Sequence, residues 1–142
     1  MKWDFSPKIE QKEGGVMILK LEPYSEKPIY EQLILEIKRG IITGELVPGE
    51  SLPSVRSLAA DIGINLHTVN KVYKFLQAEN ILVKEKSGFK VSPDQRFIPT
   101  EETMANIRQL AYELQIEKKL HQLSDEEFLG MMASVEEELI KR

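Results

Sequence analysis

The sequence predicts a mainly helical α+β fold, in which three short helices are followed by a two-stranded ribbon and then by two further helices. Apolar residues recur at helical spacing, and Gly63 separates the second helical segment from the third. Two short apolar runs flank the turn-forming residues Lys86-Ser87-Gly88 and predict the ribbon. Three helices and a ribbon indicate a winged helix-turn-helix domain, followed here by a two-helix C-terminal dimerisation tail.

The composition is that of an ordinary globular protein. The chain has 142 residues, of which 42% are hydrophobic and 30% are charged, a balance that excludes a disordered chain. It has no cysteine, which excludes disulfides, thiolate metal sites and cysteine nucleophiles. No apolar run reaches the length that spans a bilayer, and the start lacks the apolar core of a signal peptide. We therefore expect a cytoplasmic protein without membrane contact.

The chain divides into three parts that differ in charge. We expect a flexible leader over residues 1–24, with room for a short strand, the winged domain over 25–93 and the tail over 94–142. Residues 28–92 carry eight basic and seven acidic side chains, whereas residues 93–142 carry six basic and eleven acidic ones. Because DNA binding responds to local positive potential, the net charge of −4 does not exclude it.

The first helix is predicted from Pro28 to Gly44. Proline suits the first helical turn, because its missing N–H would have no partner there. The apolar residues that follow at a spacing of four are Ile29, Leu33, Ile37 and Ile41. Ahead of this helix, the run Ile18–Leu21 either pairs as a strand or packs on the core.

The helix-turn-helix is predicted within residues 54–80. Gly63 can take the positive φ that ends its first helix, and Ala59 lets the two helices approach closely. Ser54 and Asn65 each precede a helix and are good N-caps. The apolar residues at the crossing are Leu58, Ala59, Ile62, Ile64, Val69 and Val72.

The ribbon is predicted over residues 81–91, where two apolar runs flank a tight turn. Lys86 and Gly88 lie at the tip of this turn, and Lys84 and Lys90 lie in the strands. These lysines either contact DNA or protect an exposed edge strand from pairing. We expect DNA contact at Lys86 and Gly88.

The tail is predicted as two amphipathic helices. The first begins at Thr100, and the second begins at a capping box formed by Ser124 and Glu127. Two helices of this length cannot enclose a core of their own, so a second copy of the chain is the simplest partner. The apolar residues that we expect at the dimer interface are Met104, Ile107, Leu110, Leu114, Phe128, Met132, Val135 and Leu139.

A polar face on the helix after the turn indicates DNA binding. His67, Asn70, Lys71 and Lys74 recur on one side of it, and the N-terminal residues of a recognition helix reach base edges. Asparagine pairs with adenine, whereas lysine donates to guanine or to a phosphate. Taken alone, this spacing indicates only a solvated helix face. Its place in a helix-turn-helix favours contact with DNA.

Further candidates lie in the first turn of the preceding helix. The helix dipole disfavours a cation there, so contact with phosphate is the natural reason for Arg56. Ser54 and Ser57 offer hydroxyl donors to phosphate, and Ser54 also serves as an N-cap.

No catalytic or metal-binding constellation is found in the sequence. His67 and His121 lie far apart, and neither has a His or Cys neighbour at metal-ligand spacing. No glycine-rich phosphate loop or nucleophile elbow occurs. The acidic runs 125–127 and 136–138 are typical of capping and solvated charges. We therefore expect no enzyme, no cofactor and no metal.

Three segments carry a family resemblance: P-I-Y-E-Q-L at 28–33, G-E-L-V-P-G-E-S-L-P-S-V-R-S-L-A at 44–59 and H-T-V-N-K-V-Y at 67–73. They closely resemble the GntR family of bacterial transcription regulators. The short helical remainder resembles the YtrA subfamily, which implies dimerisation through the tail and repression of transporter operons. The resemblance assigns DNA contacts to Arg56, Asn65, His67 and Thr68. It also makes Ser54 the serine that starts the preceding helix.

Two functions compete for this sequence. The leading one is a homodimeric, sequence-specific regulator, a repressor that binds a palindromic double-stranded DNA operator. The alternative is a winged helix used for protein contact, which does not read DNA sequence. Asn70 and the lysines on the recognition helix favour the first. Whether the protein binds a small-molecule effector is left open, because no polar constellation in the sequence marks a pocket.

Overall fold

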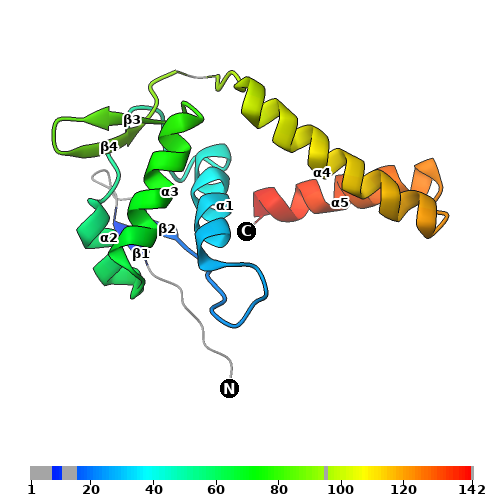
Figure 1. Cartoon of the computed structure of the whole chain (residues 1–142), viewed down its shortest axis with the longest axis horizontal. Helices are drawn as coiled ribbons and strands as arrows, with labels where there is room; N and C mark the ends of the chain where they lie inside the picture. The colour runs from blue at the N-terminus through cyan, green and yellow to red at the C-terminus, as the bar shows by residue number, and fades with distance from the viewer. Residues whose placement is uncertain (1–7, 11–15, 95, 142) are drawn as a thin grey trace. The chain divides into compact units, whose positions relative to one another are not determined.

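The computed structural model describes residues 8–10, 16–94 and 96–141. It contains two compact units, Met1–Ile98 and Pro99–Arg142. Figure 1 shows the elements in chain order: β1 (Lys8–Glu10), β2 (Val16–Ile18), α1 (Ile29–Ile42), α2 (Val55–Ile62), α3 (Leu66–Ala78), β3 (Leu82–Glu85), β4 (Gly88–Val91), α4 (Glu101–Leu120) and α5 (Asp125–Lys141). The mainly helical fold with a small ribbon is confirmed.

Helix α1 begins directly after Pro28 and ends just before Gly44, as predicted. Leu33 and Ile37 are fully buried, and Ile41 is half-buried. The apolar residues at a spacing of four thus form the side of α1 that packs on the core. Gly44 has a φ of 82°, a left-handed conformation that glycine adopts without strain.

Helices α2 and α3 form the predicted helix-turn-helix. The Ser54 hydroxyl oxygen accepts from the backbone N–H of Ser57 at 3.0 Å, and Asn65 Oδ1 accepts from that of His67 at 2.8 Å. Gly63 ends α2 with a φ of 69°. The two caps and the turn are local features, and all three are confirmed.

The core of the first unit lies between its three helices and its ribbon. Tyr73 donates its hydroxyl to the carbonyl of Pro53 at 2.8 Å, and its ring meets that of Phe89 edge-on at 5.4 Å between centroids. Burial raises the pKa of the Tyr73 hydroxyl, which therefore remains a donor. The buried hydrophobic residues are Leu19, Leu21, Leu33, Ile34, Ile37, Leu46, Leu52, Leu58, Ala59, Ile62, Val69, Val72, Tyr73, Leu76, Leu82, Phe89 and Val91.

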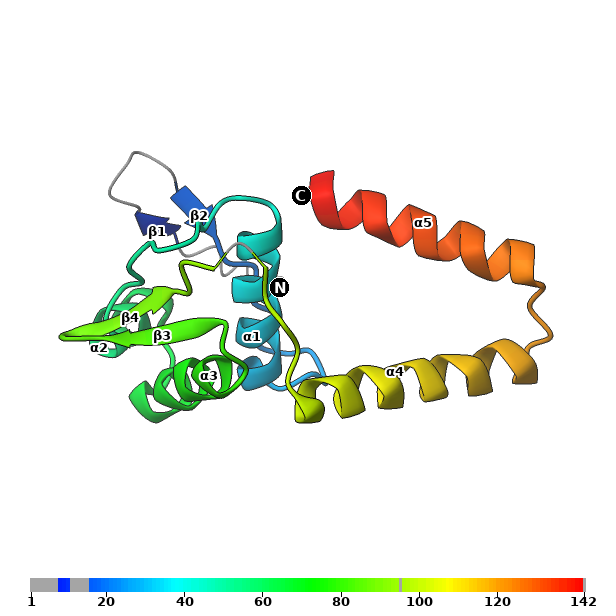
Figure 2. The ribbon, with the colours of Figure 1, turned by 90° about the horizontal axis from the view of Figure 1, so that it is seen from above.

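Strands β3 and β4 form the predicted ribbon, beside α3 (Figure 2). Leu82 pairs with Val91 in an antiparallel register. An isolated bridge between Ser51 and Lys90 attaches the loop before α2 to the outer side of β4. The ribbon is therefore joined to the helix-turn-helix through its backbone as well as through the core.

The N-terminal segment adds a two-stranded sheet, β1–β2, that the sequence did not predict as a pair. Directly after β2, Leu19 and Leu21 are buried in the core. Both alternatives given for the run Ile18–Leu21 therefore apply. Ile18 ends strand β2, and Leu19 and Leu21 pack on the core. Part of the expected leader therefore belongs to the folded unit. Residues 1–7 and 11–15 lie outside the described residues.

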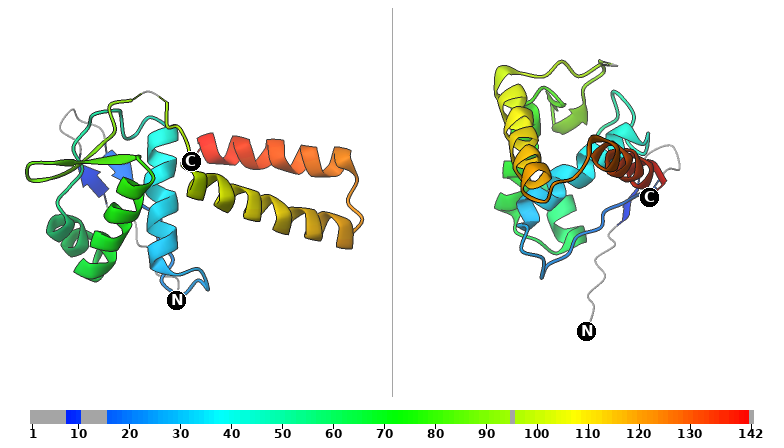
Figure 3. Two further views of the ribbon diagram at one scale, coloured as in Figure 1. Left: turned by 45° about the horizontal axis from the view of Figure 1, so that its top comes forward. Right: turned by 90° about the vertical axis from the view of Figure 1, so that its right-hand side faces the viewer.

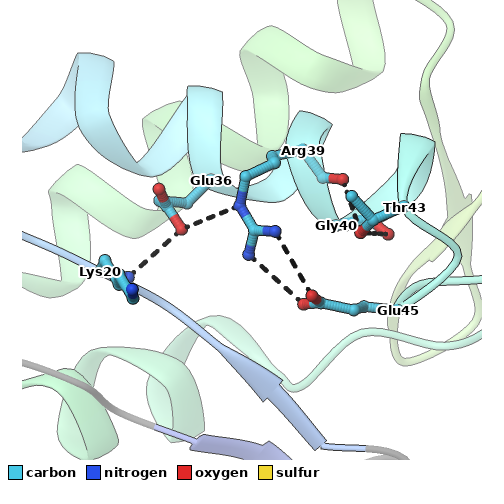
Figure 4. Close-up of polar contacts among 6 residues, drawn as sticks. All are labelled: Lys20, Glu36, Arg39, Gly40, Thr43 and Glu45. Atoms are coloured by element: carbon cyan, nitrogen blue, oxygen red, sulfur yellow. Dashed lines mark hydrogen bonds and ion pairs between the residues drawn. The ribbon is translucent and has the colours of Figure 1, made fainter. Parts of the chain in front are cut away.

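A buried polar cluster fixes this segment to α1 (Figure 4). The Glu36 carboxylate accepts from the backbone N–H of Lys20 at 3.2 Å and lies 3.6 Å from Nε of Arg39. The guanidinium of Arg39 reaches the Glu45 carboxylate at 3.3 Å. Because buried charges are tolerated only when they are paired, this cluster holds three separate segments in one arrangement.

The second unit is a hairpin of two antiparallel helices, α4 and α5 (Figure 3). The N–H of Leu123 donates to the carbonyl of Lys118, and Gln122, at a φ of 54°, donates to that of Lys119. This is the Schellman arrangement that ends many helices. Across the turn, the ammonium of Lys118 lies 2.8 Å from a carboxylate oxygen of Asp125.

Side-chain caps begin both helices of the tail. The hydroxyl of Thr100 accepts from the N–H of Thr103 at 3.0 Å. Ser124 and Glu127 form the predicted capping box, with reciprocal bonds of 3.1 and 3.2 Å. No residue of α4 or α5 is buried, and the structure describes every residue of both. The tail hairpin is therefore well capped and has no core.

Candidate nucleic-acid interface

Helix α3 has two chemically different sides. The residues on its buried side are Val69, Val72, Tyr73 and Leu76. On the opposite side His67, Lys71 and Lys74 are exposed, while Thr68 and Asn70 are half-buried at its borders. The predicted polar face is thus present on one helix, with its amide, imidazole and ammonium groups open to a partner.

The first turns of α2 and α3 contribute the next group. Arg56 and Ser57 are exposed in the first turn of α2. The side-chain oxygens of Ser54 and Asn65 serve as N-caps, so both positions have a structural role whether or not they also touch DNA. The first turn of a helix presents backbone N–H groups and a positive dipole end, which attract phosphate.

The ribbon offers a lysine at its tip. Lys86 is exposed and Gly88 is half-buried. The neighbouring acid, Glu85, is half-buried and accepts from the Ser51 hydroxyl at 2.8 Å. This hydrogen bond holds the carboxylate against the loop before α2. The charge exposed at the tip is therefore the positive charge of Lys86.

A cluster of rings and charges, which we call the α1–α3 seam, lies where these helices meet. The rings of Tyr30 and Phe75 meet edge-on, with 6.2 Å between centroids. The ammonium of Lys71 lies 5.4 Å from the centroid of Tyr30, and that of Lys38 lies 5.7 Å from the centroid of Phe75. Lys38 also pairs with Glu79 at 2.7 Å.

The sequence analysis did not include Tyr30 among the candidate DNA-binding residues. Burial, followed by the nearby carboxylates of Glu79 and Glu31, raises the pKa of the Tyr30 hydroxyl. The contact with Lys71 joins two helices, and the spacing of residues within one helix carries no sign of it. The only available signal was an aromatic residue at the border of the α1 stripe.

The residues proposed for dimerisation lie on the surface of the tail hairpin. Phe128 is half-buried, and the other seven are exposed: Met104, Ile107, Leu110, Leu114, Met132, Val135 and Leu139. A cavity of about 510 Å³ lies along α4, with three apolar residues and two glutamates in its wall: Leu110, Glu113, Leu114, Ile116 and Glu117.

The described part of the chain holds no group of three or more His, Asp or Glu side chains placed to bind a metal ion. None of the helices within it combines the length and the apolar character needed to cross a membrane.

Comparison with known proteins connects this geometry to a family. Residues 29–91 match the family described as bacterial regulatory proteins, gntR family. The transcriptional repressor YtrA of Bacillus subtilis (strain 168) is 45% identical over 65 residues, which cover 46% of this chain and 50% of YtrA. This chain therefore spans about half the length of that relative.

Solved structures extend the match. A transcriptional antiterminator from Listeria monocytogenes EGD-e has a TM-score of 0.77 and 25% identity, with 85% of this chain and 91% of that one covered. YtrA from Sulfolobus acidocaldarius, a GntR-family transcription factor, has a TM-score of 0.56 and 35% identity, with 69% of this chain and 97% of that one covered. The chain belongs to the GntR family of transcription regulators, whose winged helix-turn-helix binds DNA, and the family does not consist of enzymes.

Proposed function

We propose that this regulator represses transcription by binding a palindromic operator as a homodimer. The observation that carries the proposal is the division of α3 into a buried apolar side and an exposed polar side. Such a helix offers donors and acceptors to base edges in the major groove while its other side holds the fold together.

The candidate residues fall into two groups by chemistry. Asn70 and His67, on α3, are suited to base edges, since an amide can accept from and donate to adenine. Arg56 and Ser57, in the first turn of α2, and Lys86, at the ribbon tip, are suited to phosphates. The candidates that border these contacts are Ser54, Asn65, Thr68, Lys71, Lys74 and Gly88.

Homodimerisation through the tail is supported by its exposed apolar residues. Leu110 and Leu114, for example, line the cavity along α4 and remain in contact with solvent. An apolar surface of this extent is rare on a soluble monomer, and a second copy of the tail would cover it. A two-fold dimer would also present two recognition helices to the two halves of a palindrome.

Binding of labelled DNA from upstream of the protein's own gene tests the DNA part of the proposal. We expect an affinity that falls steeply between about 50 and 200 mM salt, because cationic side chains displace ions from the backbone. Arg56→Ala should weaken binding without changing the melting temperature. Lys27→Ala, an exposed lysine ahead of α1, serves as the matched control. Salt-independent binding, or normal binding by Arg56→Ala, would contradict the proposal.

Truncation tests the dimer. A chain that ends at Pro99 keeps every residue of the buried core and lacks both tail helices. We expect sedimentation to show a dimer for the full chain and a monomer for the truncated one, with much weaker operator binding. A full-length chain that is monomeric at micromolar concentration would contradict the proposed dimer. A truncated chain that still dimerises would contradict dimerisation through the tail.

The direction of regulation is proposed from similarity. YtrA of Bacillus subtilis is named a repressor, and the resemblance to its subfamily supports control of a transporter operon. A reporter fused to the bound promoter should become more active when the regulator is deleted. A small-molecule effector would appear in the same assay as a compound that releases repression only when the regulator is present.

A further inference from the structure

Lys71 differs from the other lysine on the exposed side of α3 in being held by an aromatic ring. Its ammonium lies 5.4 Å from the centroid of Tyr30, within the range where a cation is attracted to a ring face. Phe75 is one turn further along the same side of α3 and fixes the Tyr30 ring edge-on. Lys74 is exposed in the same helix.

The direction in which Lys71 is held decides what it can reach. A recognition helix in the major groove points its outermost residues at the bases and its flanks at the walls of the groove, which are phosphate backbone. Tyr30 belongs to α1, so its ring draws the Lys71 ammonium toward the α1 flank of α3. Asn70, the preceding residue, lies about 100° around the helix from Lys71, at the border of the exposed side.

The charges around the seam also favour a phosphate as the partner of Lys71. The seam's other lysine, Lys38, is ion-paired with Glu79 at 2.7 Å, which neutralises its charge locally. Lys71 is exposed and keeps its ammonium at the rim of the seam. An ammonium is a compact point charge that suits a phosphate, whereas bidentate recognition of guanine is the strength of arginine.

We infer that Tyr30 is a positioning residue that holds Lys71 toward a DNA backbone phosphate, so that Lys71 contributes binding strength rather than sequence selectivity. The inference rests on the proposed function of α3 as the recognition helix. It adds Tyr30, a residue of α1, to the DNA-binding machinery. It also assigns Lys71 to the backbone, where the residue type alone allows either guanine or phosphate.

A double-mutant cycle tests this assignment with two probes. One is a pool of short random-sequence duplexes, and the other is the duplex that the unaltered protein selects from that pool. Lys71→Ala should weaken binding to both probes by a similar factor and reduce the slope of affinity against salt by about 0.9. Tyr30→Leu should weaken binding to both about two- to fivefold, the range expected for one exposed cation–ring contact.

Two further variants separate positioning from other roles. Tyr30→Phe keeps the ring and should bind like the unaltered protein. In a Lys71→Ala background, Tyr30→Leu should have no further effect. Lys38→Gln removes the other lysine of the seam and should leave the salt slope unchanged. Circular dichroism and melting temperature establish that each variant is folded.

Three results would overturn the inference while leaving the proposed function intact. The first is that the effects of Tyr30→Leu and Lys71→Ala on DNA affinity are additive. The second is that Tyr30→Phe lowers DNA affinity as much as Tyr30→Leu does. The third is a Lys71→Ala variant that loses preference for one base but binds the random pool normally. Failure of the unaltered protein to select any duplex would instead remove the proposed function, and the inference with it.

Discussion

In the winged unit the apolar side chains of three helices and a ribbon are buried together, whereas in the tail every apolar side chain of α4 and α5 keeps contact with solvent. The helix ends of the tail are nevertheless satisfied by local interactions, as those of α2 and α3 are. The turn of the tail combines a Schellman motif, a capping box and an ion pair between Lys118 and Asp125.

The contrast separates local from tertiary stabilisation. A cap contributes about 1 kcal/mol, and an isolated helix of the length of α4 is marginal in water. A buried leucine or isoleucine contributes about 1.5–3 kcal/mol, and the winged unit contains many of them. Capping thus defines where the tail helices begin and end, and we expect their persistence to depend on the proposed partner. The winged unit carries its own stability.

Truncating one buried and one exposed residue should give the largest difference between the units. Ile37 is 0% exposed in α1, and Leu114 is 40% exposed in α4. Ile37→Ala should lower the free energy of unfolding of the winged unit by about 2–5 kcal/mol, because it leaves a cavity. Leu114→Ala should change that quantity by about 0.5 kcal/mol at most and weaken self-association instead.

Native-state hydrogen exchange of the α3 amides measures the first quantity, and sedimentation measures the second. Equal effects of both substitutions on α3 exchange would mean that the two units do not unfold independently.

Removing a hydroxyl from one tyrosine in each unit should give a smaller difference. Tyr73→Phe leaves the carbonyl of Pro53, a half-buried residue, without its donor, and the expected loss is about 1–3 kcal/mol. Tyr112 is 62% exposed in α4, so Tyr112→Phe should be nearly neutral. The midpoint of urea unfolding checks both. A neutral Tyr73→Phe would show that water replaces the tyrosine hydroxyl.

The features that sequence predicted are those set by neighbours in the chain. The caps Ser54 and Asn65, the turn at Gly63 and the capping box at Ser124 depend on residues at most a few positions away. Apolar periodicity likewise indicated the core side of α1 and α3. Each of these follows from backbone geometry that a short window of sequence contains.

The features that sequence missed join segments far apart in the chain. The bond from Ser51 to Glu85, which holds the ribbon's acid, spans 34 positions. The contact between Tyr30 and Lys71 and the buried pair of Glu36 and Arg39 with Lys20 also depend on how α1 packs. The candidate DNA-binding face was therefore predictable as a list of residues, but not the contacts that orient them.

Glycine substitutions directly after α3 and α4 should have a smaller effect on the stability of the two units. Each helix is followed by a residue in the left-handed region, Asn80 at a φ of 62° and Gln122 at 54°. Asparagine tolerates this region better than glutamine, and glycine occupies it without strain. Gln122→Gly should stabilise the tail by up to about 1 kcal/mol, and Asn80→Gly should stabilise the winged unit by less.

Melting of the helical circular dichroism signal checks the tail substitution, with Gln122→Ala as a control that should give no gain. A loss of stability in Gln122→Gly would mean that the turn between α4 and α5 does not keep this conformation in solution.

The smallest effect concerns acid titration of the capping box. The pKa of the Glu127 carboxyl lies below its ordinary value of 4.5, because the backbone N–H and then the hydroxyl of Ser124 donate to it. Since the folded pKa is the lower one, the contribution of the box is fully present above pH 4.5 and is lost as the pH falls through the folded pKa.

Carboxyl-carbon NMR should place the midpoint of Glu127 below 4.5. Ser124→Pro, which removes both donors, should return it to the ordinary value, and Ser124→Ala should return it part of the way. A Glu127 that titrates normally in the unaltered chain would show that the tail, unlike the winged unit, does not keep its local bonds in solution.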